Sequence, residues 1–227
     1  MIKAVIFDWG GTIAVAEAPW DTISERIADR LQLEDINLEP MDIKKSIDKA
    51  TQYRREQAKL GVELNSFQFF SHALGLLGHT VDVDITDELE QYVYEMTTPV
   101  FAEGLEETLM ELSEDYKLAL LSNVWLEGPR QSLRDLGYDR WFDAMVLSCD
   151  IGIPKPDPRI FQHILNLLSI EPDEAVMVGD SLEADINGAM GTGLHAVLFD
   201  PTGSSGWSGR KIQRLSDLPP LIQGMCS

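Results

Sequence analysis

Basic residues are scarce in this sequence. Its 227 residues include 18 Lys and Arg against 38 Asp and Glu, which gives a formal net charge of −20. Binding to nucleic acid through its phosphates requires clustered Lys and Arg, so the composition argues against a nucleic-acid partner. It also argues against binding to an anionic membrane surface. The excess of acid is then most simply a means of keeping the protein in solution.

Cysteines and long hydrophobic runs are also nearly absent. The two cysteines, Cys149 and Cys226, follow no metal-ligand spacing and suggest no disulfide framework. No apolar run approaches the roughly 18 residues of a membrane span. Asp8 interrupts the first apolar stretch too early for a signal peptide. With an ordinary 44% of hydrophobic residues, the sequence predicts a globular, cytoplasmic protein with no membrane partner.

The most informative stretch lies at the N-terminus. Residues 4–7 form a continuous apolar run, typical of a strand buried on both faces of a parallel sheet. The run ends at Asp8, and Gly10, Gly11 and Thr12 follow. Open α/β sheets carry their ligands at the carboxyl ends of such strands. A plain turn, in which Asp8 binds its own backbone, is the alternative.

Residues 15–97 have a different character, with helical periodicity and no convincing strand. Apolar residues at helical spacing, with Pro, Asp and Gly near the ends, predict four helices at residues 19–33, 39–60, 65–77 and 86–96. We expect this block to form a small helical domain.

From residue 103 onward, helices and strands alternate. Predicted strands cover residues 117–121, 144–147, 175–178 and 196–199. Predicted helices cover 103–115, 129–136, a segment capped by Asp157 with Pro158 in its first turn, 182–190 and about 218–222, with a loop at 201–209.

This alternation predicts a doubly wound, Rossmann-like parallel sheet with an α/β core. The first strand must belong to the same sheet, between the strands that end at Leu121 and Val178. Residues 1–14 and 98–227 would then form the core, and residues 15–97 would be a helical cap inserted above its strand ends.

Four segments place polar residues at the ends of predicted strands or helices, where they would meet at one edge of the sheet. They are Asp8 with Gly10, Gly11 and Thr12; Ser122 with Asn123; Lys155 between two prolines; and Gly179-Asp180-Ser181 with Asp185. Each segment alone has a simpler interpretation. Asp180 could only cap a helix, with Glu183 three residues later, and Asp185 could be a surface acid.

The four segments, in this order, resemble the motifs of the haloacid dehalogenase-like hydrolase superfamily, in the subclass with a helical cap inserted after the nucleophile motif. The resemblance covers nearly the whole chain. It implies a magnesium-dependent phosphatase for a small phosphorylated substrate, in which Asp8 forms an aspartyl-phosphate.

The resemblance also implies a role for each residue. Asp8, the carbonyl of Gly10 and Asp180 would hold Mg²⁺, an ion that prefers oxygen ligands. Lys155 would neutralise Asp8 and the transferred group. The phosphoryl oxygens would be bound by Gly11, Thr12, Ser122, Asn123 and Lys155. Ser181 and Asp185 would support the metal or its bound waters without contacting the metal directly.

The sequence departs from this family at Gly10. Phosphatases of the family usually carry a second Asp there, which protonates the leaving oxygen, and general acid–base catalysis typically contributes roughly 10²–10⁴ in rate. Two alternatives therefore remain. The first is cleavage of a C–P or a C–halogen bond. Cleavage of a C–P bond would also need a Schiff-base lysine in the cap, which could be Lys44, Lys45 or Lys49. The second is phosphate binding with little turnover.

Two further groups of residues have open roles. Trp9 and Trp125 flank the predicted nucleophile and phosphate loops, where they could shape a pocket or simply pack in the core. A basic cluster in the helical block is expected to be a solvated helix face, and consists of Lys44, Lys45, Lys49, Arg54, Arg55 and Lys59. The sequence names neither the substrate nor the oligomeric state.

Overall fold

The computed structural model describes residues 1–225 and contains a six-stranded, parallel sheet in the order β5-β4-β1-β6-β7-β8. Its strands are β1 (Ala4–Phe7), β4 (Lys117–Ser122), β5 (Ala144–Leu147), β6 (Ala175–Gly179), β7 (His195–Phe199) and β8 (Lys211–Ile212). The predicted doubly wound α/β fold is confirmed, and β1 lies between β4 and β6 as expected. The sequence did not predict β8, because two residues are too few to show a strand pattern.

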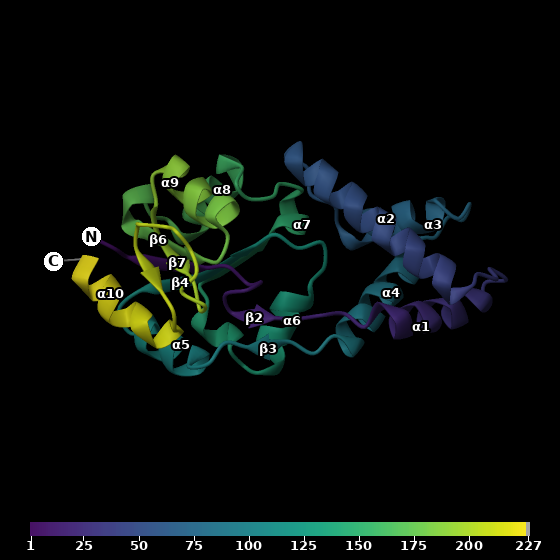
Figure 1. The fold of residues 1–227 in the computed structure, drawn as a ribbon, viewed down its shortest axis with the longest axis horizontal. Helices are drawn as coiled ribbons and strands as arrows, with labels where there is room; N and C mark the ends of the chain where they lie inside the picture. The colour runs from purple at the N-terminus through teal and green to yellow at the C-terminus, as the bar shows by residue number, and fades with distance from the viewer. Residues whose placement is uncertain (226–227) are drawn as a thin grey trace.

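Helices cover both faces of the sheet (Figure 1). The helices α5 (Leu105–Ser113), α6 (Gly128–Asp135) and α10 (Leu218–Met225) pack on one face, and α8 (Pro158–Leu168) and α9 (Gly188–Thr192) pack on the other. Successive residues of β1 alternate between these faces, with Val5 and Phe7 in one apolar cluster and Ala4 and Ile6 in the other. Burial on both sides explains why the strand is apolar throughout.

The helical block has a hydrophobic core of its own. It comprises α1 (Trp20–Gln32), α2 (Pro40–Lys59), α3 (Ser66–Gly75) and α4 (Val83–Met96), which gather at the end of the molecule away from the sheet (Figure 1). All four predicted helices are present. The helix α4 begins three residues early because the Asp82 side chain accepts a hydrogen bond from the Ile85 amide and caps it.

A short antiparallel ribbon connects the two halves. It pairs β2 (Ala14–Val15) with β3 (Val100–Phe101), where the chain leaves the sheet half and where it returns. The predicted boundary at residues 14/15 falls within β2, and the one at 97/98 falls just before β3. The division into a core and a cap stays a prediction. The sequence showed neither strand, since each is two residues long.

Several short helices complete the fold. The predicted helix at 182–190 is a π-helical turn, η3 (Leu182–Asn187), followed by α9. Cys149 lies in the short helix α7 (Ser148–Ile151), directly after β5, and Cys226 lies outside the described residues. The others are η1 (Asp139–Trp141), η2 (Pro172–Glu174) and η4 (Leu215–Asp217). Within residues 1–225, no helix is both long and apolar enough to cross a membrane.

Candidate active site

Asp8 lies directly after β1, and its amide continues the sheet by donating a hydrogen bond to the Val178 carbonyl at 2.9 Å. Its carboxylate lines a cavity of about 210 Å³, here called the aspartate cavity. All four predicted segments contribute to its wall, which comprises Asp8, Trp9, Gly10, Ser122, Asn123, Val124, Lys155, Asp180, Ser181, Ala184 and Asp185. The expected convergence at one edge of the sheet is therefore present.

Lys155 is the centre of this arrangement. Its ammonium group donates to Asp8 Oδ1 at 2.7 Å, to Asp185 Oδ1 at 2.6 Å and to the Leu121 carbonyl at 2.7 Å. The lysine side chain is 1% exposed. A buried ammonium has three hydrogens to satisfy, and these three acceptors satisfy all of them. Lys155 is thus an internal ion-pair partner and not a solvated loop residue.

Burial and charge shift the pKa values of these groups. Burial raises the pKa of Asp8 to about 6, with Lys155 opposing the shift and Asp185 adding to it. Burial opposes the charge on Lys155, but the carboxylates of Asp8 and Asp185 outweigh it and raise the pKa of the lysine. Burial, followed by the neighbouring charge of Asp185, raises the pKa of Asp180. Three carboxylates therefore crowd one ammonium.

This crowding suits a cation. Asp8, Asp180 and Asp185 each offer a carboxylate oxygen, and these oxygens lie within 4.8 Å of one another. Lys155 supplies a single positive charge against three carboxylates, so the set retains excess negative charge that a hard, oxygen-preferring ion such as Mg²⁺ would offset. Asp180 is the exposed member of the three and faces the cavity. The residues present fit a magnesium ion.

Asp180 and Asp185 do not have the simpler roles considered above. Ser181, not Asp180, caps η3, since its hydroxyl accepts from the Ala184 amide at 3.1 Å. Asp185 is buried, and its second oxygen accepts from the Ser181 amide at 3.0 Å. The structure thus places Asp185 in the cavity wall, where it fixes both Lys155 and the turn after β6.

Ser122, the last residue of β4, and Asn123, which follows it, line the same cavity. Ser122 is buried at its wall. The Asn123 side chain is engaged with the main chain of Lys155, accepting from its amide at 2.7 Å and donating to its carbonyl at 2.9 Å. Asn123 therefore positions the lysine segment, which the sequence did not indicate.

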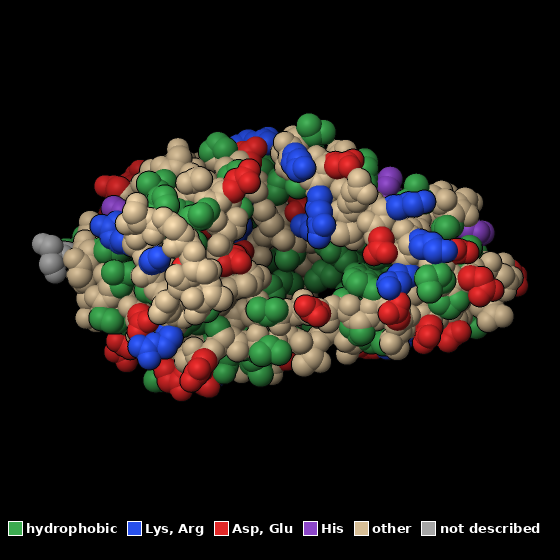
Figure 2. All heavy atoms as spheres, in the orientation of Figure 1, with side chains coloured by type: hydrophobic (Ala, Val, Ile, Leu, Met, Phe, Trp, Pro, Cys, Tyr) green, Lys and Arg blue, Asp and Glu red, His purple; other side chains and the backbone are tan. Residues whose placement is uncertain are grey.

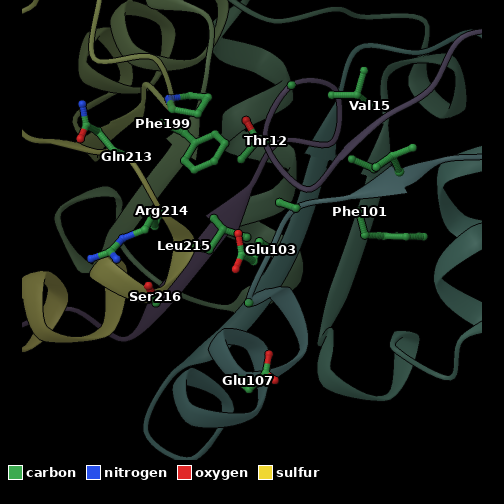
Figure 3. Close-up of a pocket in the computed structure, with 16 residues that line it drawn as sticks. Thr12, Val15, Phe101, Glu103, Glu107, Phe199, Gln213, Arg214, Leu215 and Ser216 are labelled. Atoms are coloured by element: carbon green, nitrogen blue, oxygen red, sulfur yellow. The ribbon is translucent and has the colours of Figure 1, made fainter.

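Gly11 and Thr12 are placed differently from the other predicted site residues. Their amides donate inside the turn, to the Ala14 carbonyl at 3.0 Å and the Trp9 carbonyl at 3.3 Å. Thr12 is buried and lines a separate cavity of about 670 Å³ together with Phe199, Glu103 and Arg214 (Figure 3). This arrangement favours the amides of Trp9 and Gly10 over those of Gly11 and Thr12 as anion donors.

The two glycines of this turn have different constraints. Gly11 has a φ of +74°, and a Cβ there would lie 2.2 Å from Asp180 Oδ2. Gly10 has an ordinary φ, and a Cβ would meet nothing within 4 Å. The backbone conformation at Gly11 and the nearby Asp180 carboxylate therefore require glycine, whereas Gly10 could carry a side chain without strain.

A larger cavity adjoins the aspartate cavity. It has a volume of about 420 Å³, lies between the sheet half and the helical half, and contains the side chains of Trp9, Trp20 and Trp125. We call it the tryptophan cavity, and Figure 2 shows the molecule hollowed between its two halves, with hydrophobic side chains in the hollow. Trp125 also stacks on Phe69 of α3, with ring centroids 4.0 Å apart, so it both shapes the cavity and packs in the helical core.

One polar cluster at this junction escaped the sequence analysis. The Arg54 side chain lines the tryptophan cavity and binds the buried carboxylate of Glu63 through two hydrogen bonds. Glu63 also accepts from the Ser148 hydroxyl at 2.9 Å, across the two halves. Arg54 is thus not part of a solvated face, although Lys45 and Arg55 are exposed. Glu63 and Ser148 lie in loop and helix-end positions with no motif to reveal them.

Comparison with known proteins agrees with this geometry. A family model described as haloacid dehalogenase-like hydrolase matches residues 2–190. The chain belongs to the haloacid dehalogenase-like hydrolase family. The suspected resemblance is therefore confirmed over most of the chain.

Individual relatives match over shorter regions. The N-acylneuraminate-9-phosphatase of Mus musculus is 32% identical over 132 residues, covering 56% of this chain and 53% of that protein. A phosphoserine phosphatase of Thermus thermophilus is 40% identical over 83 residues, covering 37% of this chain and 33% of that protein. The chain thus spans about half, or less, of the length of these curated relatives.

Solved structures match over nearly the full length. A HAD phosphatase from Thermococcus onnurineus aligns with a TM-score of 0.72 at 26% identity, covering 98% of this chain and 99% of that one. A 2-haloacid dehalogenase from Pseudomonas syringae aligns with a TM-score of 0.71 at 23% identity, covering 99% of this chain and 100% of that one. The second likeness shows the fold alone.

The contrast between the two glycines gives a stability prediction. Gly11→Ala forces a Cβ into a left-handed backbone position and against the Asp180 carboxylate, so we expect it to lower the free energy of unfolding by at least about 1 kcal/mol. Gly10→Ala is the matched control and should stay within about 0.5 kcal/mol of the unsubstituted protein. Urea unfolding measures both. An equal decrease in the free energy of unfolding of the two variants would contradict the conclusion that only Gly11 must be glycine.

The acidic cluster gives a metal-binding prediction. Asp180→Asn removes one carboxylate from the set, and we expect the affinity for Mg²⁺, measured by calorimetry, to fall at least about tenfold. Glu183→Gln is the control, because Glu183 is exposed and lies outside the cluster. Unchanged affinity in Asp180→Asn would remove Asp180 from the ligand set.

Proposed function

We propose that this chain is a magnesium-dependent phosphatase that acts on a small phosphorylated molecule through an aspartyl-phosphate on Asp8. The observation that carries the proposal is the pairing of the Asp8 carboxylate with the buried Lys155 ammonium at 2.7 Å, inside a cavity that also contains Asp180. The phosphatases among its partial relatives support the same reaction class. The acidic composition supports a small-molecule substrate over a nucleic-acid or membrane partner, and a cytoplasmic location is part of the proposal.

Asp8 performs the bond exchange in this mechanism. An oxygen of its carboxylate attacks phosphorus, the bond from phosphorus to the ester oxygen breaks, and the leaving alcohol takes up a proton. Water then attacks the aspartyl-phosphate, releasing inorganic phosphate and restoring the carboxylate. Lys155 favours the ionised, nucleophilic form of Asp8, since its charge opposes the effect of burial on the pKa of that carboxyl group.

The phosphoryl oxygens need donors around Asp8. The Ser122 hydroxyl and the main-chain amides of Trp9, Gly10 and Asn123 lie in the wall of the aspartate cavity and are suited to this task. Lys155 contributes charge while its hydrogens hold Asp8 and Asp185. In this proposal the predicted phosphate-binding residues Gly11 and Thr12 act by shaping the turn.

The metal would be held by Asp8, Asp180 and the carbonyl of Gly10, with Ser181 and Asp185 supporting the site from behind. When bound, Mg²⁺ supplies positive charge that offsets the charge of the phosphoryl group. Residues 15–97 are proposed to serve as the cap, because the helical half closes the tryptophan cavity above the strand ends.

The structure favours phosphate-ester cleavage over C–P or C–halogen cleavage. A phosphonate hydrolase would need a cap lysine near the nucleophile, but Lys44 pairs with Asp21 at 2.8 Å and Lys45 with Asp42 at 3.2 Å. Lys44, Lys45 and Lys49 are all absent from the described walls of the two cavities beside Asp8. Halide displacement needs no metal, whereas three carboxylates here fit one.

The first functional prediction concerns the nucleophile. Asp8→Asn fills the same space but cannot attack phosphorus, so we expect phosphate release from a panel of phosphorylated metabolites to fall by at least about 10⁴-fold. Asp200→Asn is the control, since Asp200 also follows a strand and is buried but lines neither cavity beside Asp8. Turnover in Asp8→Asn that matches the unsubstituted protein would exclude Asp8 as the nucleophile.

The second functional prediction concerns Gly10, where the usual acid is missing. Gly10→Asp should fold, because the position has an ordinary φ and open space. If only a general acid is lacking, alkyl phosphates should gain up to about 10²-fold in kcat, and an activated aryl phosphate should gain least. Gly10→Asn is the matched control and should give no gain. A stable Gly10→Asp variant without any gain on alkyl phosphates would falsify the missing-acid account.

A further inference from the structure

The tryptophan cavity is placed to hold the part of a substrate that is not phosphate. It shares Trp9, Gly10, Asn123 and Val124 with the aspartate cavity, so the two cavities lie on either side of the same residues. Its volume of about 420 Å³ is within the range of small-ligand sites. A phosphoryl group beside Asp8 would therefore leave the rest of its molecule among the three tryptophans.

The charge of the cavity wall is unusual for this protein. The chain carries 38 acids and 18 bases, yet among the described residues that line the tryptophan cavity Arg54 is the only charged one. Its side chain is 18% exposed. The wall is otherwise aromatic, aliphatic or neutral, so a ligand in this cavity meets one cation and no carboxylate.

Part of the Arg54 guanidinium remains free to bind a ligand. Nε donates to Glu63 Oε1 at 2.6 Å, and Nη2 donates to Glu63 Oε2 at 2.7 Å. Nη1 has no hydrogen-bond partner within residues 1–225. A guanidinium group is planar and carries five N–H donors. The edge of Arg54 that includes Nη1 can therefore pair with a second carboxylate while Glu63 binds the edge formed by Nε and Nη2.

Glu63 holds the arginine in place from inside the protein. Its side chain is fully buried, at 0% exposed. Besides Arg54, it accepts from the Ser148 hydroxyl at 2.9 Å and the Leu64 amide at 3.0 Å. The guanidinium is thus ordered before any ligand arrives, which lowers the entropic cost of binding.

The charge balance favours a monovalent anion over a second phosphate. Glu63 already neutralises much of the Arg54 charge, and the rest of the wall offers no cation. A phosphate monoester carries about −1.5 to −2 at neutral pH and would be poorly compensated there. A carboxylate carries a single charge, and it matches the guanidinium edge with two parallel hydrogen bonds.

We propose that Arg54 binds a carboxylate on the substrate, so that the substrates are phosphate monoesters of hydroxy acids whose apolar or flat portion lies against Trp9, Trp20 and Trp125. This inference rests on the proposed function for the phosphoryl half of the molecule. Glu63 acts as a positioning residue, and Arg54 selects the substrate.

Binding is measured with protein that cannot turn the ligand over. Calorimetry on the Asp8→Asn protein compares phosphate monoesters of short ω-hydroxy acids and of para-hydroxybenzoate with the same esters carrying a neutral amide in place of the carboxylate. We expect the best carboxylate to bind about 10- to 100-fold more tightly than its amide, as charge-assisted hydrogen bonds do. The corresponding bisphosphates form a third arm and should bind less tightly than the carboxylates.

Two variants in the same background separate ligand binding from a structural role. Glu63→Gln removes the buried acid but keeps the cation, so the preference for carboxylate should persist or increase. Arg54→Gln combined with Glu63→Gln removes the cation without leaving Glu63 charged and unpaired, a state that would threaten folding, and the preference should disappear. Arg55→Gln, on the exposed side of α2, is the control and should keep the preference.

Each outcome decides the matter. Loss of the preference in the double variant with its retention in Glu63→Gln supports the assignment. No preference in any ester pair, an undiminished preference in the double variant, or tighter binding of the bisphosphate overturns it. Because these are binding measurements, they stand even if the unsubstituted protein releases no phosphate, a result that would instead reject the proposed function.

Discussion

The buried ammonium of Lys155 is the interaction on which the site depends. It joins Asp8 at the end of β1, the Leu121 carbonyl in β4, and Asp185 in η3 behind β6. Removing a charge from water is costly unless it is paired and fully hydrogen-bonded. The three acceptors satisfy that requirement only when the central strands are in register, so the ion-pair cluster and the sheet order support one another.

The same cluster explains the details of the surrounding turns. Asn123 binds both main-chain groups of Lys155, which fixes the segment that presents the lysine. Asp185 uses its second oxygen on the Ser181 amide, and Ser181 in turn caps η3. Gly11 allows the turn after Asp8 to approach the Asp180 carboxylate. Asp8, Asn123, Lys155, Ser181 and Asp185 are therefore each held by hydrogen bonds within this cluster, and Asp8 and Asp185 have little freedom to separate.

Sequence reasoning predicted the parallel sheet, the place of β1 between β4 and β6, and the convergence of Asp8, Ser122, Lys155 and Asp180, because buried parallel strands are apolar and end abruptly on polar residues. It missed β2, β3 and β8, since two-residue strands carry no periodic pattern. It did not predict the hydrogen bonds that Asn123 and Asp185 make with Lys155. It also placed Arg54 on a solvated helix face, whereas Arg54 is half-buried and binds Glu63. The roles of Asn123 and Asp185 depend on partners 30 or more residues away, and the role of Arg54 depends on a loop glutamate with no local signature.

The Glu63 cluster links the two halves of the molecule at the point where substrate would lie. Glu63 precedes α3 in the helical half, and Ser148 begins α7 in the sheet half. The Ser148 hydroxyl also accepts from the Val124 amide at 2.9 Å, and Val124 follows Asn123 in the wall of the aspartate cavity. A chain of hydrogen bonds thus runs from Arg54 to the loop that borders Asp8. Because the donors and acceptors along it are buried or partly buried, the position of the helical half and the shape of the loop after β4 are coupled physically.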